Sequence, residues 1–203
     1  MIDLTRDGDL WTVTLNRPDK ANSVTPDMLA RIAEIAEQAR GQARVFVLTG
    51  AGKVFSAGAD IEAAKAGLAV DPVWERLSGA IAGLPCLTIA ALNGTLAGGS
   101  FGMALACDLR IAVPGARFFY PVAKLGFLPQ PSDPGRLVAL VGPARAKMIL
   151  LAGAKVEAEE ALAWGLVDRI VPREALGATV AELAEASLSA APDHIAAIKA
   201  LAT

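Results

Sequence analysis

Three segments of the chain carry the residue types that could do chemistry: Thr49–Asp60, Asn93–Gly102 and Tyr120–Leu137. Glycine and alanine let a backbone approach a ligand closely, so the first segment could present its N–H groups to one. It could equally form a plain turn after a buried strand. It is not a phosphate loop, because that motif requires serine or threonine where this chain has Val54. It is not a dinucleotide fingerprint either, because that motif requires glycine where this chain has Phe55.

The second segment lies between an expected strand and an expected helix, and its glycines fall at the helix entry. Such an entry leaves backbone N–H groups without partners, and the helix dipole there favours an anion or a developing oxyanion. Close packing of the helix through small residues would account for the same glycines. Spacing alone leaves both interpretations open.

Residues Gly98–Gly102 of this segment also match the G-x-S-x-G pattern, with Ser100 as a nucleophile. Followed by Asp168 and His194, the order of the three residues is that of an α/β-hydrolase. However, Asn93–Ala97 separate the pattern from its strand, whereas a nucleophile elbow follows the strand at once. A serine hydrolase or thioesterase is therefore an alternative rather than the leading hypothesis.

The third segment contains one acidic residue, Asp133, which lies between Pro131 and Pro134. Aspartate between prolines often serves as a turn former. It could also act as a lone general base or acid, since a single carboxyl group can remove a proton and return it. Both roles stay open for this residue.

The elements that must position these segments alternate between strand and helix. Apolar or β-branched runs bounded by turn residues predict strands, and apolar residues at helical spacing behind a capping residue predict helices. The predicted strands are Leu10–Leu15, Val45–Thr49, Leu87–Leu92, Leu109–Val113 and Arg169–Val171. The predicted helices are Pro26–Ala39, Asp71–Ala82, Gly99–Ala106, Pro143–Ala152, Val156–Trp164, Glu174–Ala190 and a last one opened by Pro192. This alternation indicates the α/β class, with a final third that is nearly all helix.

Composition excludes several classes of protein. The 203 residues are 54% hydrophobic, which supports a sizeable core and leaves apolar area for contact with another subunit. A net charge of −2 argues against a general nucleic-acid binder, though a few local groups could hold a small anion. Two cysteines and one histidine exclude a disulfide framework, a cysteine-based metal site and two-histidine chemistry. The polar N-terminus is unlike a signal peptide and no stretch is long enough to span a membrane, so we expect a cytoplasmic protein.

Taken together, the segments resemble the crotonase superfamily, also called the enoyl-CoA hydratase/isomerase family. The resemblance runs from about Leu10 to Lys199 and rests on six stretches that follow one another at suitable spacing. They are Leu15–Ser23, Leu48–Ile61, Ala90–Ile111, Leu125–Gly126, Leu140–Gly153 and Ala161–Pro172.

This resemblance implies a spiral of ββα turns over residues 1–142 and a helical C-terminal region over residues 143–203, shortened relative to the family. It implies acyl-CoA as substrate, no metal or redox cofactor, and assembly as a homotrimer or a dimer of trimers. The backbone N–H groups of Ala59 and Gly99 match the family's oxyanion hole. The residues that match the family's CoA-lining stretches are Lys20, Ala21, Ser56, Ala57, Asp60 and Ile61.

The sequence departs from the hydratase pattern at both positions where that pattern has a glutamate. These positions are Gly102 and Val122, and neither side chain can exchange a proton. Loss of even one acid/base group costs roughly 10²–10⁴-fold in rate. We therefore expect an isomerase or another single-base reaction rather than efficient hydration, with Asp133 as the possible acid or base. A catalytically inactive CoA-binding protein is a further alternative.

Overall fold

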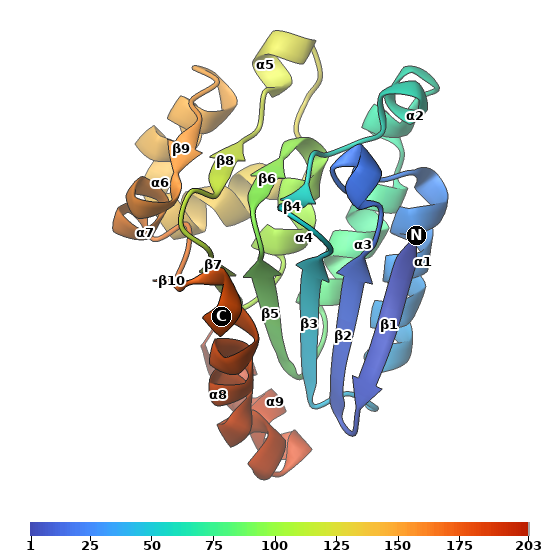
Figure 1. The fold of residues 1–203 in the computed structure, drawn as a ribbon, viewed down its shortest axis with the longest axis vertical. Helices are drawn as coiled ribbons and strands as arrows, with labels where there is room; N and C mark the ends of the chain where they lie inside the picture. The colour runs from blue at the N-terminus through green and yellow to red at the C-terminus, as the bar shows by residue number, and fades with distance from the viewer. Residues whose placement is uncertain (203) are drawn as a thin grey trace.

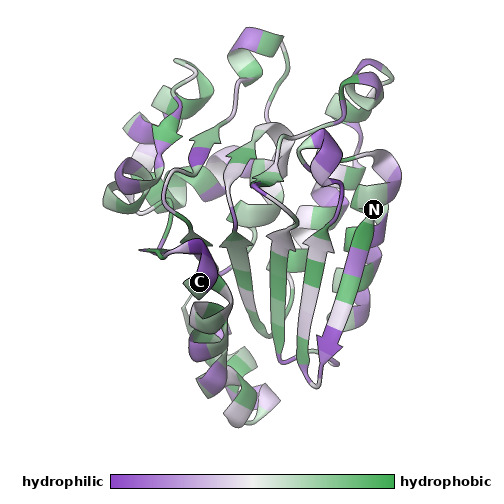
Figure 2. Cartoon of the chain, in the orientation of Figure 1, coloured by the Kyte–Doolittle hydropathy of each residue, from purple (hydrophilic) through white to green (hydrophobic). Residues whose placement is uncertain are grey.

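The larger of two sheets contains six strands in the computed structural model, which describes residues 1–202. In spatial order they are β1 (Ile2–Asp7), β2 (Leu10–Leu15), β3 (Val45–Gly50), β5 (Leu87–Leu92), β7 (Leu109–Ala112) and β10 (Arg169–Ile170). β1 and β2 form an antiparallel hairpin, and the other neighbours pair in parallel. Strands β3 and β5 are mostly hydrophobic (Figure 2), as expected for the buried centre of a parallel sheet, whereas β1 at the edge alternates with polar residues and is largely exposed.

A smaller sheet contains the short strands β4 (Val54–Ser56), β6 (Thr95–Ala97), β8 (Arg117–Phe119) and β9 (Val156–Glu157), in that order. Strands β3, β5 and β7 are each followed by the next strand of this sheet, and helices come after. The chain thus repeats a strand–strand–helix unit and winds as a spiral (Figure 1), which confirms the predicted α/β class and ββα architecture. The short strands themselves were not predicted.

Helices pack around both sheets. They are α1 (Pro26–Ala39), α2 (Ile61–Lys65), α3 (Val73–Ala82), α4 (Phe101–Leu105), α5 (Val122–Leu125), α6 (Asp133–Leu150), α7 (Ala158–Trp164), α8 (Leu176–Ser189) and α9 (Pro192–Leu201). Helices α1 and α3 contact each other behind the larger sheet (Figure 1). Helix α1 begins as predicted, because the Thr25 side chain accepts a hydrogen bond from the Met28 amide and Pro26 occupies the first turn.

Helix α6 begins ten residues earlier than the predicted helix Pro143–Ala152. Asp133 starts it and Pro134 lies in its first turn, where proline is tolerated because it needs no intrahelical N–H partner. Gly142 interrupts it with φ 78° and ψ 164°, directly before Pro143. Two helical pieces therefore meet at a glycine, and the first piece, residues 133–141, was not predicted.

Residues 143–203, expected as a helical region, also extend both sheets. Strand β9 pairs antiparallel with β8, and β10 pairs parallel with β7. The last residue, Thr203, lies outside the described part of the chain. Across residues 1–202, no helix combines the length and apolar character needed to cross a bilayer.

Candidate active site

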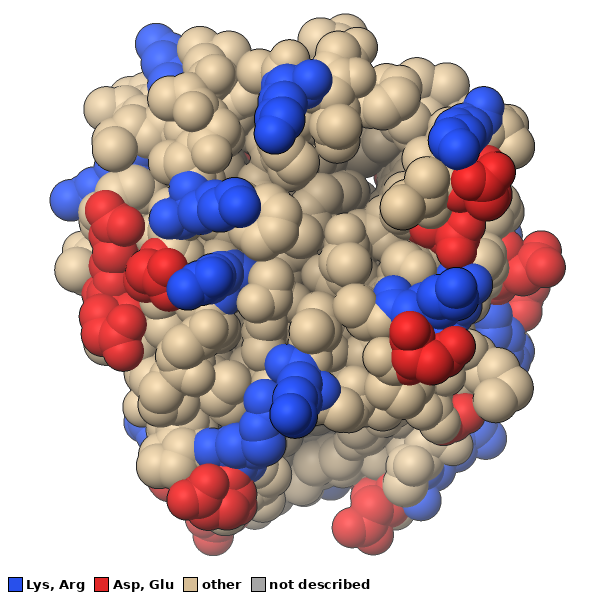
Figure 3. Space-filling view, turned by 45° about the horizontal axis from the view of Figure 1, so that its top comes forward, with Lys and Arg blue, Asp and Glu red and all other residues tan. Residues whose placement is uncertain are grey.

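A cavity of about 400 Å³ opens where the two glycine-rich segments meet α2 and α5. Figure 3 shows a hollow on the face of the molecule that carries several lysine and arginine side chains. Most of the wall is apolar. The lining residues are Ala57, Ala59, Ile61, Ala64, Lys65, Ala69, Trp74, Ala97, Gly98, Gly99, Phe119, Tyr120, Pro121, Val122, Leu125, Phe127, Leu128 and Gln130.

The two glycine-rich loops touch through Gly58 and Gly98. A Cβ added to Gly58 would lie 3.0 Å from the Ala97 carbonyl oxygen, and Gly58 has a φ of +95°, so this approach requires glycine. The contact places Ala59 and Gly99 together on the cavity wall. Within residues 1–202, neither Ala59 nor Gly99 donates its amide to a protein acceptor. The pair of free N–H groups is the arrangement that an oxyanion needs.

A buried hydroxyl pair joins the same two loops. The Ser56 hydroxyl donates to the Asn22 carbonyl oxygen at 2.8 Å and accepts from the Gly58 amide at 3.2 Å. Because a hydroxyl carries one hydrogen, the Ser100 hydroxyl must donate to Ser56, 2.7 Å away. The pair therefore fixes the first loop against the second, next to both free amides.

The structure contradicts the serine hydrolase alternative. Ser100 is 0% exposed and its hydroxyl donates to Ser56, so it is not available as a nucleophile. His194 lies exposed on α9, and Asp168 accepts hydrogen bonds from the backbone and side chain of Arg110. The three residues do not form a triad, because the G-x-S-x-G pattern here belongs to a packed helix entry.

Two asparagines that the sequence analysis did not single out hold the first loop in shape. The Asn22 side chain donates to the carbonyl oxygens of Ala51 and Val54 at 2.8 and 2.7 Å. The Asn93 side chain accepts from the Gly50 amide at 3.0 Å and donates back to the same loop. Both are buried, so their hydrogen bonds are made in a low dielectric, where they are strong.

Asp60 braces the loop immediately after Ala59. Its carboxylate accepts from the Arg17 guanidinium at 2.8 Å and caps α2 by accepting from the Glu62 and Ala63 amides. The hydrogen bond from Arg17 is the main cause that lowers the pKa of Asp60 below its usual value. Asp60 therefore stays ionised and fixes the backbone that follows Ala59, at the start of α2.

The predicted CoA-lining residues lie near one another, but only some face the cavity. Ala57 and Ile61 line it, whereas Ser56 is buried and Asp60 is engaged with Arg17. The Ala57 amide donates to the Ala21 carbonyl oxygen at 2.9 Å, which places the half-buried Ala21 and the exposed Lys20 beside the first loop.

Asp133 occupies the space that a side chain at position 102 would need. A Cβ built on Gly102 would lie 2.6 Å from Asp133 Oδ1 and 3.2 Å from Oδ2. The segment before Asp133 is tied to α3, because Glu75 accepts from both the amide and the hydroxyl of Ser132, at 3.0 and 2.5 Å. Glycine at position 102 thus makes room for a carboxyl group supplied by a different part of the chain.

Tyr120 contacts this carboxyl group. Its hydroxyl donates to Asp133 Oδ2 at 2.9 Å, and its ring stacks on Phe101 with centroids 5.5 Å apart. Asp133 is 1% exposed, and its Oδ1 has no hydrogen-bond partner within residues 1–202. Burial raises the pKa of Asp133 from its ordinary value of 3.8 to about 7, against a smaller lowering by Tyr120.

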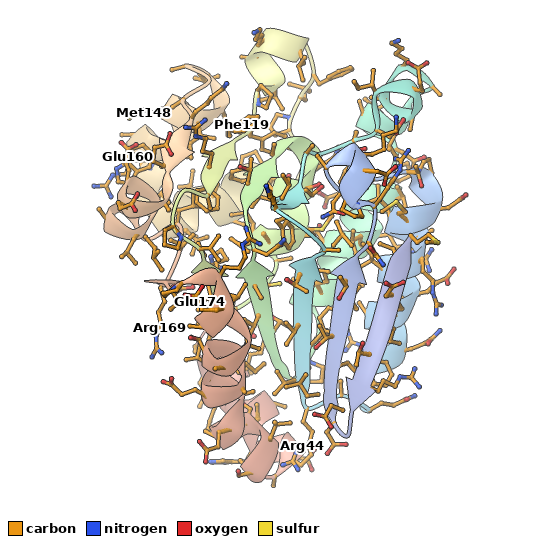
Figure 4. The ribbon with its side chains drawn as sticks, viewed as in Figure 1. Arg44, Phe119, Met148, Glu160, Arg169 and Glu174 are labelled. Carbon is orange, nitrogen blue, oxygen red and sulfur yellow. The ribbon has the colours of Figure 1, made fainter. Side chains whose placement is uncertain are left out.

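Aromatic side chains form the remaining walls. The Trp74 ring lies over Gly99, where an added Cβ would be 3.1 Å from it, and the indole N–H donates to the Leu68 carbonyl oxygen. Phe119 lies on β8 beneath α5 (Figure 4). Neither Tyr120 nor Trp74 was predicted as a site residue. Tyr120 is the chain's single tyrosine, which is a weak signal, and no spacing rule indicates that either residue meets the glycine loops.

Comparison with known proteins identifies the family of the chain. The model of the family described as enoyl-CoA hydratase/isomerase matches residues 5–202. The chain belongs to this family. It is accordingly an enzyme of a lyase and isomerase family, and the predicted crotonase resemblance is confirmed.

Individual family members are similar over nearly the whole chain. The carnitinyl-CoA dehydratase of Citrobacter koseri is 39% identical over 96% of this chain and 77% of its own length. An enoyl-CoA hydratase/isomerase from Pseudoalteromonas atlantica superposes with a TM-score of 0.91 and 30% identity, over 98% of this chain and 81% of that one. A monofunctional enoyl-CoA isomerase from M. smegmatis gives 0.84 and 33%, over 98% and 90%.

Proposed function

We propose that this enoyl-CoA hydratase/isomerase family member binds an acyl-CoA thioester with its carbonyl oxygen between the Ala59 and Gly99 amides. These free N–H groups would polarise the carbonyl and stabilise the enolate that forms when a neighbouring carbon loses its proton. Their position on the wall of an apolar cavity supports this role, because hydrogen bonds to a developing charge are worth more where water is excluded. The chemistry requires no metal or redox cofactor.

The reaction we favour is a single-base one, such as a shift of the double bond in an enoyl-CoA. The observation that carries this proposal is the Asp133 carboxyl group in the space beside Gly102. Val122, which lines the cavity, provides no second acid or base. One carboxyl group with a pKa of about 7 can remove a proton from one carbon and return it to another at neutral pH.

A dehydration is the second candidate, favoured by the 39% identity to a carnitinyl-CoA dehydratase. It also begins with loss of a proton beside the thioester, so the same two amides and Asp133 would serve it. It differs in the second step, because the departing hydroxide must be protonated. The single carboxyl group would have to supply that proton after removing the first.

Turnover of a panel of CoA esters in deuterated water, read by mass spectrometry, separates these reactions. We expect 3-enoyl-CoA to convert to 2-enoyl-CoA with deuterium uptake, and 2-enoyl-CoA to add water slowly. Rapid interconversion of 2-enoyl-CoA and 3-hydroxyacyl-CoA would establish the dehydratase and overturn the isomerase. Bound CoA esters with no change in any member of the panel would establish the inactive CoA-binding alternative instead.

A further inference from the structure

The cavity wall offers few groups that can exchange a proton with a substrate. Among the described lining residues, the ionisable side chains are those of Lys65 and Tyr120. Lys65 points to solvent, where its ammonium pairs with Glu62 at 2.9 Å. Asp133 does not line the cavity and lies one hydrogen bond beyond the Tyr120 hydroxyl. A proton that moves between a bound substrate and Asp133 must therefore pass an intervening group.

Tyr120 is the residue that can connect the two, because it lines the cavity and its hydroxyl contacts Asp133. The hydroxyl donates to Asp133 Oδ2 at 2.9 Å and accepts from the Gln130 amide at 3.3 Å. Tyr120 is 3% exposed and its ring stacks on Phe101, so packing and the two hydrogen bonds together orient the hydroxyl. The Gln130 side chain donates to the Ala69 carbonyl oxygen, which ties the far side of this arrangement to the segment before α3.

We propose that Tyr120 is the catalytic residue that touches the reacting carbon, and that Asp133 exchanges protons with the substrate through the Tyr120 hydroxyl. This inference rests on the enolate chemistry proposed above. As the substrate C–H bond breaks, its electron pair moves toward the thioester oxygen and its proton goes to Tyr120 Oη. The hydrogen that Oη carried passes to Asp133 Oδ2. Tyr120 ends neutral, Asp133 ends protonated, and the reverse transfer returns the proton to a carbon.

The charges around the pair suit a relay in which tyrosine never becomes a lasting anion. Burial is the main cause that raises the pKa of Tyr120 well above its ordinary value, and the Asp133 charge raises it further. The charged groups that influence Asp133 itself are Glu75 from α3, which raises its pKa, and Arg136 from α6, which lowers it. Both hydrogens therefore have to move together, and the negative charge stays on the carboxylate until the proton arrives.

Tyr120→Phe tests the relay, because it keeps the ring and removes only the hydroxyl. Turnover of the fastest panel substrate is measured from pH 6 to 10, with CoA-ester binding measured in parallel. We expect kcat to fall roughly 10²–10⁴-fold at every pH while binding is retained. If Asp133 instead exchanged protons with the substrate directly, the variant would show a different dependence of kcat on pH. The variant would lose the hydrogen bond that lowers the pKa of Asp133, so turnover would recover at high pH. That recovery would overturn the relay and leave the proposed function intact.

A fluorine label gives a second test that does not depend on a substitution. Tyr120 is the single tyrosine, so growth with 3-fluorotyrosine changes this site alone. In the folded, labelled enzyme the fluorine resonance should titrate with Asp133 near pH 7, and turnover should change because the phenol is more acidic. A resonance unaffected by pH together with unchanged turnover would contradict the relay. If the unlabelled wild type turns over no panel substrate, the proposed function fails and the relay fails with it.

Discussion

At the scale of single residues, the site depends on two features that go together: Gly102 has no side chain, and the Asp133 carboxyl group lies beside it. The carboxyl group fills the volume that the side chain at position 102 would otherwise take, and it does so without exposure to water. Ionising a buried carboxyl group weakens the fold, because the unfolded chain holds the same charge in water. The site therefore keeps a proton acceptor that is poised near neutrality.

Asp133→Asn should change how stability depends on pH. Because folding raises the pKa of Asp133 from 3.8 to about 7, the folded chain holds this proton more tightly than the unfolded chain. Its contribution to stability is thus present below pH 4 and is lost as the pH rises to 7. Relative to the wild type, the variant should gain on the order of 4 kcal/mol between pH 4 and 8, measured by urea unfolding. An equal pH dependence in both proteins would contradict the assignment.

Gly102→Ala should damage the enzyme without adding any charged group. Its Cβ would fall 2.6 Å from Asp133 Oδ1, so the carboxyl group has to move. We expect a loss of about 1–3 kcal/mol in the free energy of unfolding and a fall in kcat. Gly135→Ala is a matched control, since a Cβ there meets no atom within 4 Å. Equal activity of the two variants would contradict this prediction, because it would show that a Cβ at position 102 does not disturb the Asp133 carboxyl group.

At the scale of elements, the two glycine loops directly follow the short strands β4 and β6, and these paired strands place both loops at the cavity. The Ser56–Ser100 hydrogen bond then holds the loops together.

Ser100→Ala should lower kcat roughly 10- to 100-fold with little change in CoA affinity, because both amide donors remain but their relative position changes. Steady-state kinetics beside direct binding measurements give this comparison. A rise in KM with unchanged kcat would assign the pair to substrate binding instead.

The same elements show what the sequence could and could not predict. Strand β2 and helix α1 have the predicted bounds, because six or more residues in a regular pattern give a clear signal. The strands of the smaller sheet have two or three residues each, too few to show a period, and none of them was predicted. The start of α6 was not predicted, because Asp133 followed by Pro134 favours a turn as readily as the first turn of a helix. The contact between Tyr120 and Asp133 depends on tertiary packing across 13 positions, and no local pattern encodes it.

At the scale of the whole molecule, large apolar side chains are exposed beside the cavity. Leu128 and Leu151 are largely exposed, and they line a groove between α5 and α6 that has almost no polar lining. Family resemblance predicts a trimer, and burial of apolar groups is its main driving force. Light scattering on the purified protein should give three or six times the chain mass of 20.9 kDa. A mass of one chain at micromolar concentration would contradict this prediction.

We propose that Asp133 supplies the proton transfer in an enolate-forming reaction. Deuterium uptake into the acyl carbons of a bound CoA ester, followed at pH 8, tests it most directly when three proteins are compared. These are the wild type, Asp133→Asn, and Asp193→Asn as a control on the exposed first turn of α9. We expect uptake to fall roughly 10²–10⁴-fold in Asp133→Asn and to equal the wild-type rate in the control. Undiminished uptake in Asp133→Asn would contradict it.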